Sequence, residues 1–159
     1  MIRLPAFRAL PAALLSGALA SFGGGALHAQ DGMRSVPSPH DVATTVDRLE
    51  AVLAENGMTV FARIDHAAGA DKAGLELPPT EVLVFGNPMV GTPLMGCSPS
   101  IAIDLPQKML AWKAEDGATR LGWNDPEWLK GRHATEGCDE VFGKVDAALN
   151  AFAAAATAE

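Results

Sequence analysis

The first thirty residues divide this chain into a leader and a domain. Arg3 and Arg8 come before an apolar stretch, and no Asp, Glu, Lys or Arg occurs over residues 9–30. A positive start, an apolar middle and small residues before the cut are typical of a secretory signal peptide. We therefore predict a cleavable signal peptide over residues 1–29, cut after Ala29. An uncleaved membrane anchor is the alternative, but a run of three glycines shortens the apolar core that a spanning helix needs.

Cleavage would leave one small acidic domain in the periplasm or outside the cell. The leader holds two of the 12 basic residues and none of the 19 acidic ones, so the net charge of the remainder is more negative than the −7 of the full chain. A nucleic-acid surface needs clustered Lys and Arg. We predict no nucleic-acid partner and no stable membrane insertion after cleavage.

The hydrophobic pattern of the remainder predicts one α+β domain over residues 38–157, after a linker over residues 30–37. A short edge strand is expected around Arg34–Val36. Apolar residues at helical spacing predict a first helix over Pro39–Asn56, with Ser38 as its N-cap. A second apolar stripe predicts a last helix that starts at Cys138 or Asp139 and ends in an alanine-rich tail.

Between these helices the pattern predicts four strands, over Met58–His66, Glu81–Phe85, Gln107–Lys113 and Thr119–Trp123. The first of these strands alternates, so Ile64 and His66 are expected on the apolar face and Arg63 and Asp65 on the other face as an ion pair. Element order and lengths predict a two-layer sandwich. Both main helices would cover one face of a mainly antiparallel sheet of four to five strands.

Several short motifs of this chain resemble the domain-of-unknown-function 302 family. They are Ala62–His66, Ala73–Leu75, Pro79–Glu81, Phe85–Pro88, Gly91–Met95, Asp104–Pro106 and Trp123–Pro126. The resemblance covers nearly the whole domain and implies a β-α-β4-α fold, grouped with TATA-binding-protein-like and helix-grip domains. It implies no reaction.

The segment from Gly86 to Pro93 is the densest irregular motif and the first candidate for a binding site. Backbone amides at short helix starts, together with the Thr92 hydroxyl, could bind a small polar ligand. The alternative is a turn with purely structural demands. The ligand-binding residues expected from sequence are Asp65, His66, Asn87, Gly91 and Thr92.

An enzyme is the rival class, a small hydrolase or isomerase that uses Asp65, His66 and Asn87 in one pocket. Ser98 and Ser100 lack the Gly-x-Ser-x-Gly elbow, so the sequence offers no nucleophilic serine. We favour a non-enzymatic binding module for a small polar ligand or a protein partner, with a homodimer as one arrangement.

Metal binding has weak support in the sequence. No two His or Cys residues have the spacing of a metal site. Met89, Met95 and Cys97 could bind copper as soft ligands, or the methionines could fill the core. We predict no cofactor and keep a copper-binding protein as an alternative.

Cys97 and Cys138 are the two cysteines of the chain. In an oxidising compartment an even pair predicts an intrachain disulfide, and free thiols or an intermolecular bridge are the alternatives.

Overall fold

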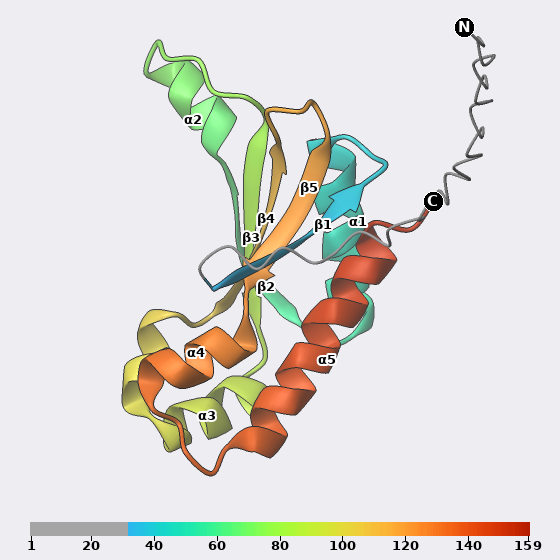
Figure 1. Ribbon diagram of the computed structural model, residues 1–159. Helices are drawn as coiled ribbons and strands as arrows, with labels where there is room; N and C mark the ends of the chain where they lie inside the picture. The colour runs from blue at the N-terminus through green and yellow to red at the C-terminus, as the bar shows by residue number, and fades with distance from the viewer. Residues whose placement is uncertain (1–31) are drawn as a thin grey trace, which may run out of the picture.

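The fold is described by a computed structural model for residues 32–159, so the expected signal peptide at residues 1–29 lies outside the described residues. Five strands form one antiparallel sheet in the order β1-β5-β4-β3-β2 (Figure 1). The strands are β1 (Met33–Ser38), β2 (Thr59–Asp65), β3 (Thr80–Gly86), β4 (Gln107–Lys113) and β5 (Thr119–Asn124).

Two long helices, α1 (Val42–Glu55) and α5 (Asp139–Ala156), pack on each other and on the same face of this sheet. The shorter helices lie beyond the ends of the strands: α2 at one end, α3 and α4 at the other (Figure 1). They are α2 (His66–Lys72), α3 (Pro88–Cys97), the 3-10 helix η1 (Pro99–Ile103) and α4 (Pro126–His133). The predicted α+β class, with helices on one face of an antiparallel sheet, is confirmed.

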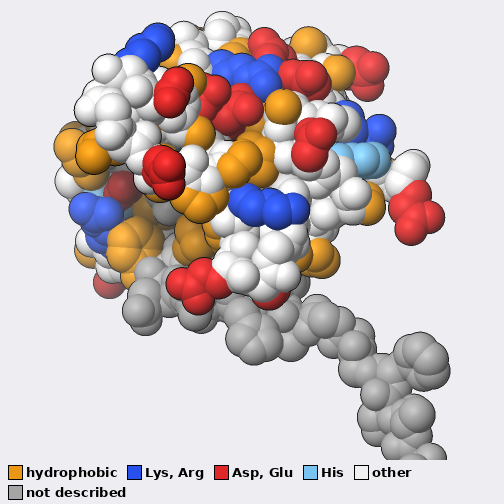
Figure 2. Space-filling model, turned by 90° about the horizontal axis from the view of Figure 1, so that it is seen from above, with side chains coloured by type: hydrophobic (Ala, Val, Ile, Leu, Met, Phe, Trp, Pro, Cys, Tyr) orange, Lys and Arg blue, Asp and Glu red, His pale blue; other side chains and the backbone are white. Residues whose placement is uncertain are grey.

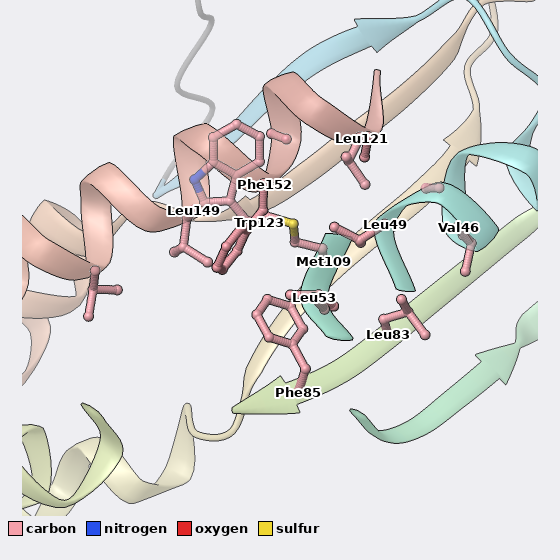
Figure 3. Packing of buried hydrophobic residues seen from close by; sticks show 14 of the residues in the cluster. Val46, Leu49, Leu53, Leu83, Phe85, Met109, Leu121, Trp123, Leu149 and Phe152 are labelled. Carbon is pink, nitrogen blue, oxygen red and sulfur yellow. The ribbon is translucent and has the colours of Figure 1, made fainter. Parts of the chain in front are cut away.

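The core lies between the sheet and the two long helices. Helix α1 contributes Val46, Leu49 and Leu53, and α5 contributes Leu149 and Phe152, all of which point toward the sheet (Figure 3). The sheet contributes the inward residues of its three central strands, which are Leu83, Phe85, Met109, Ala111, Leu121 and Trp123. Each large apolar side chain buried in this way stabilises the fold by about 1.5–3 kcal/mol relative to exposure.

The domain begins earlier than the sequence pattern predicts. Strand β1 occupies the segment expected to be a linker and pairs along its whole length with β5, from Met33 opposite Asn124 to Ser38 opposite Thr119. The short edge strand expected around Arg34–Val36 is present and spans six residues, Met33–Ser38. Pairing with the edge of the sheet decides their conformation.

The N-cap of α1 also differs from the expected residue. Asp41 is the N-cap, and its Oδ1 accepts a hydrogen bond from the Thr44 amide at 2.7 Å. Ser38, the expected cap, is the last residue of β1, and its hydroxyl hydrogen-bonds that of Thr45 at 2.7 Å. Both residue types can cap a helix, and the end of β1 fixes which one is in place.

Strand β2 departs from simple alternation because of a bulge at Phe61. The register shifts between Val60, which lies opposite Phe85, and Ala62, which lies opposite Val84. One extra residue exchanges the two faces. Arg63 therefore shares the helix-covered face, whereas the expectation that Ile64 does so was wrong: Ile64 lies on the outer face.

From this position Arg63 forms ion pairs that connect α1 to the sheet. Its guanidinium contacts Asp47 at 2.5 Å and Glu81 at 2.7 Å, with Glu50 at 3.6 Å. The hydrogen bonds to Asp47 and Glu81 raise the pKa of Arg63. The predicted ion pair with Asp65 is absent from the described contacts, because Asp65 caps α2 instead.

The surface of the domain mixes charges. Figure 2 looks down on the molecule from the α2 end and shows basic side chains dispersed among acidic ones on that face. Within residues 32–159 no helix combines the length and the apolar character needed to cross a bilayer.

Candidate functional site

A pocket of about 350 Å³ opens where β3 ends and β4 begins. Its floor is the sheet and its walls are α3, α5 and the connection from η1 into β4. Most of the lining is apolar, with large contributions from Phe85, Val90, Leu94, Leu105, Leu149 and Phe152. The ring of Phe152 meets that of Phe85 edge to face, with centroids 6.3 Å apart.

The sequence of α3 explains why this space is left open. Asn87 is the N-cap, its Oδ1 accepts from the Met89 amide at 2.9 Å, and Pro88 occupies the first turn. The ten residues of the helix bury a single side chain, Leu94, in the core. At Gly91 a Cβ would lie 4.0 Å from Leu105, so the glycine leaves room on the pocket side. Helix α3 therefore covers the end of the sheet without filling the space beneath it.

Gln107 supplies the main polar group of the pocket. It is the first residue of β4 and stands on the inward face with Met109 and Ala111. Its side-chain nitrogen is buried and has no hydrogen-bond partner within residues 32–159. A buried amide without a partner costs about 1–3 kcal/mol. An acceptor on a bound molecule would recover that loss.

The other polar residues of the pocket lie toward its mouth. Lys144 is exposed on α5 and pairs with Glu140 at 2.7 Å, which lowers the pKa of Glu140. Asn87 donates to the Gly57 carbonyl at 3.2 Å and accepts from the Met89 amide as the cap of α3, so both ends of its side-chain amide are engaged within the protein. Among the polar lining residues, Gln107 is the one with a buried side-chain nitrogen that has no partner within residues 32–159.

The structure brings together only part of the site predicted from sequence. Asn87, Gly91 and Thr92 all line the pocket. Asp65 and His66 do not line it. Asp65 lies opposite Glu81 in the sheet, at the other end of the strands from the pocket. At 3.3 Å per residue, this end is roughly 20 Å from Asn87.

Asp65 and His66 form the start of α2 instead. The Asp65 carboxylate accepts from the Ala68 amide at 2.8 Å and starts α2. His66 is the first residue of that helix and is exposed. Since neither side chain lies near Asn87, the three residues do not form the pocket on which the hydrolase or isomerase alternative depends.

Thr92 lines the pocket but does not start a helix. It lies inside α3, which continues through Pro93 to Cys97, so Thr92-Pro93 is not a helix start. Its side chain is exposed at the edge of the pocket. A threonine followed by proline is typical of a helix start, so the sequence also predicts one at Thr92-Pro93. That prediction was wrong, because Pro93 is an interior residue of α3.

The two cysteines are joined beside the pocket. A disulfide links Cys97, the last residue of α3, to Cys138, the N-cap of α5, with Cα atoms 6.3 Å apart. The bridge holds two walls of the pocket together. It also uses the Cys97 sulfur, so the copper alternative loses its thiolate ligand. Within residues 32–159 no cluster of three or more His, Cys, Asp or Glu is placed to hold a metal ion.

Sequence reasoning missed Gln107 and the α5 side of the pocket. A signal for Gln107 was present, because strand alternation places it on the same face as Met109 and Ala111, where a polar residue needs an explanation. The contribution of Ala148 and Leu149 had no such signal. The apolar stripe of α5 predicts that these side chains are buried, but it does not distinguish packing on the sheet from lining a cavity.

The fold and the pocket together define a small two-layer α+β domain with an apolar cavity at one end of its sheet. A family model described as Domain of unknown function DUF302 matches residues 34–152, and the chain belongs to this family. The resemblance drawn from the sequence motifs is confirmed.

A solved structure supports the fold. The structure described as "Crystal structure of uncharacterized conserved protein DUF302 from Bacillus stearothermophilus" superposes with a TM-score of 0.69 at 21% identity. The match covers 76% of this chain and 94% of that one. At this identity the likeness concerns the fold.

Two relatives are closer in sequence but longer. Each is named "Fluoride-specific ion channel FluC 1", one from Brucella suis biovar 1 (strain 1330) and one from Brucella abortus biovar 1 (strain 9-941). Both are 50% identical over 103 residues, which is 65% of this chain and 41% and 38% of theirs. The chain therefore spans about two fifths of the length of these relatives.

Proposed function

We propose that this domain is a binding module for a small, largely apolar molecule that carries one hydrogen-bond acceptor. The observation behind the proposal is the pocket with the unpartnered amide nitrogen of Gln107 inside it. Sites for small molecules are mostly apolar and contain a few polar groups that fix orientation. The apolar walls shift our expectation from a small polar ligand to an amphiphilic one.

The size of the pocket sets the class of ligand. A volume of about 350 Å³ lies at the lower end of the range of about 300–1,000 Å³ that is usual for ligand sites. A medium-length alkyl chain with a hydroxyl or carbonyl head has suitable dimensions and chemistry. The head would accept from Gln107 while the chain contacts Val90, Leu105 and Leu149.

The proposed place of action is the periplasm or the cell exterior. The leader over residues 1–29 has the composition of a signal peptide. A disulfide between Cys97 and Cys138 suits an oxidising compartment. Recovery of mature protein that begins near Gln30 would test this, and recovery of the full-length chain in membranes would contradict it.

Titration with primary alkanols from hexanol to dodecanol tests the pocket directly. We expect chemical-shift changes confined to residues of β3, α3, η1, β4 and α5 that face the pocket, with affinity rising with chain length until the space is filled. Absence of binding along the whole series would reject an amphiphile site.

A matched pair of α5 variants makes the test specific. Ala148 lines the pocket and its neighbour Ala147 is exposed on the outer side of the helix. We expect Ala148→Leu to fill the pocket and lower alkanol affinity by about tenfold or more, since each methylene of contact is worth about 0.8 kcal/mol. Ala147→Leu should leave affinity unchanged. Equal affinities of the two variants would exclude this pocket as the binding site.

A substitution at Gln107 separates binding from folding. Gln107→Met keeps the length of the side chain and removes the unpartnered nitrogen, so the free energy of unfolding should rise by about 1 kcal/mol. Alkanol affinity should fall in the same variant, because the head group loses its donor. A protein stabilised without loss of affinity would show that Gln107 does not contact the ligand.

A further inference from the structure

A second cluster of reactive side chains lies outside the pocket, where η1 meets α4. The Ser100 hydroxyl is 2.9 Å from Nδ1 of His133, and Nε2 of the same ring is 2.6 Å from Oδ2 of Asp104. The other carboxylate oxygen of Asp104 contacts the guanidinium of Arg132 at 3.2 Å. Serine, imidazole and carboxylate thus form one continuous chain of hydrogen bonds.

The positions of the protons follow from the chemistry of the groups. An ionised carboxylate can only accept, so the hydrogen of the neutral imidazole must be on Nε2, which faces Asp104. Nδ1 then carries the lone pair and accepts the hydrogen of the Ser100 hydroxyl. The Ser98 hydroxyl, 3.0 Å from that of Ser100, is left to donate to the Ser100 oxygen. The ring is held in the tautomer that can remove a proton from the serine.

The serine is exposed and the two groups behind it are mostly buried, as a nucleophile requires. Ser100 is exposed, His133 is 8% exposed and the Asp104 side chain is 13% exposed. A substrate can therefore reach the hydroxyl while the base and the carboxylate are shielded from water.

The protein around this cluster is firmly held. Ile101, between Ser100 and Asp104 in the chain, is fully buried in the core. The disulfide at Cys97 fixes the chain just before η1, and Thr135 hydrogen-bonds the Lys130 carbonyl just after His133. A reactive constellation needs such support to keep its geometry.

We propose that Ser100 is a nucleophilic serine that accepts the acyl group of a small ester, with His133 as general base and Asp104 as a positioning residue. Ser98 and Ser100 lack the Gly-x-Ser-x-Gly elbow, so no sequence motif indicates this role. The elbow is one way to place a serine beside a base, and the contact of η1 with α4 is another. Ser100 does not line the pocket, so this proposal stands apart from the binding function.

The reaction balances with water as the second substrate. The Ser100 oxygen attacks the ester carbonyl carbon while its proton passes to Nδ1 of His133, and the bond to the alcohol oxygen breaks as the alcohol takes that proton. Water then attacks the acyl-serine, giving its proton to Nδ1. The serine oxygen leaves with this proton and a carboxylic acid is released.

Covalent labelling with diisopropyl fluorophosphate tests the nucleophile. We expect a single adduct on Ser100 of the folded protein, located by peptide mass spectrometry, and slow release of p-nitrophenol from p-nitrophenyl acetate. Ser100→Ala should abolish both, and Ser35→Ala, on the edge strand β1, should change neither. No adduct on Ser100, or labelling no faster than in urea-unfolded protein, would overturn the proposal.

Asp104→Asn tests the positioning role with almost no change of shape. The amide nitrogen introduced by this substitution would donate to Nε2 of His133 and move the ring hydrogen to Nδ1, so labelling should slow by about 100-fold or more. Should this variant fail to fold, the nitrogen chemical shifts of His133 in the unaltered protein decide the point. A hydrogen on Nε2 supports the proposal, and a hydrogen on Nδ1 refutes it.

Discussion

The two ends of the sheet are held by different kinds of interaction. At the end where β2 leads into α2, exposed aspartates hydrogen-bond nearby backbone amides: Asp41 to Thr44, Asp65 to Ala68 and Asp116 to Ala118. Helix α2 buries no residue at all. At the opposite end α3, η1 and α4 are held by buried apolar side chains, the Cys97–Cys138 disulfide and the Ser100–His133–Asp104 cluster.

This difference separates local order from global stability. Contacts between residues near in sequence fix a turn or a helix start but do little to hold the whole fold. Contacts between α3, α5 and the sheet join distant parts of the chain. Both candidate sites lie at the end that has such contacts, where side chains are placed accurately.

The largest effect should come from removing a core side chain at the packed end. Leu94 of α3 is 1% exposed and Leu75, just after α2, is 66% exposed. Leu94→Ala should lower the free energy of unfolding by about 2–5 kcal/mol, and Leu75→Ala by less than about 0.5 kcal/mol. Urea unfolding measures both. Equal losses would contradict the contrast between the ends.

Loss of the disulfide should rank second. A double variant, Cys97→Ser with Cys138→Ser, should lower the free energy of unfolding by about 2–4 kcal/mol, because the unfolded chain regains the freedom that the bridge removes. Adding a reductant to the unaltered protein should give the same shift in urea midpoint. A reductant that changes nothing would mean that the thiols are free in the purified protein.

A smaller, local effect is expected for the α2 cap. Asp65→Ala removes the acceptor for the Ala68 amide, which costs about 1 kcal/mol of helix stability. Amide hydrogen exchange should become faster within His66–Lys72 while the urea midpoint hardly moves. Asp71→Ala, in the same helix and outside its cap, is the control. A clear fall in the urea midpoint of Asp65→Ala would show that α2 is coupled to the core.

The smallest effect should be the pH dependence of stability that comes from the exposed aspartates Asp41 and Asp116. The backbone hydrogen bond from Thr44 lowers the pKa of Asp41, and that from Ala118 lowers the pKa of Asp116. A lowered pKa in the folded state stabilises the fold above the unfolded value of about 4, and this is lost as pH falls through the folded value.

Asp41→Asn isolates this contribution, because the amide oxygen can still cap α1 but does not titrate. The unaltered protein should be the more stable of the two at neutral pH, and the difference should shrink below about pH 4. Urea unfolding at several pH values measures it. A difference that is constant across this range would assign the effect of Asp41 to something other than its charge.

Much of the fold could be predicted because local signals agreed with tertiary packing. The apolar stripes of α1 and α5 appear where the pattern placed them. Asn87-Pro88 and Asp116-Gly117 are typical start and turn signals, and the structure has a helix start and a turn at these positions. Helix α4 was missed because its eight residues have no apolar stripe. Its Asp125-Pro126 start is the same signal as Asn87-Pro88, and a uniform reading of that signal would have found the helix.

The sites were harder to predict because they depend on contacts between distant segments. Ser100 and His133 are 33 residues apart, and nothing near either one indicates the other. Asp65 and His66 attracted attention because adjacent acid and imidazole groups suggest catalysis, but the fold uses the acid as a helix cap. The bulge at Phe61 shows the same limit, since one residue without a sequence signal exchanges the faces of β2.

The disulfide also determines what holds the chain together after proteolysis. Cys97 and Cys138 are 41 positions apart, and the segment between them contains η1, two of the three central strands, β4 and β5, and α4. The bridge closes this segment into a ring whose exposed turn contains Asp116 and Gly117. A protease that cuts once in this turn produces two polypeptides that stay linked through sulfur, so the nicked protein gains only the mass of one water until a reductant allows the pieces to separate.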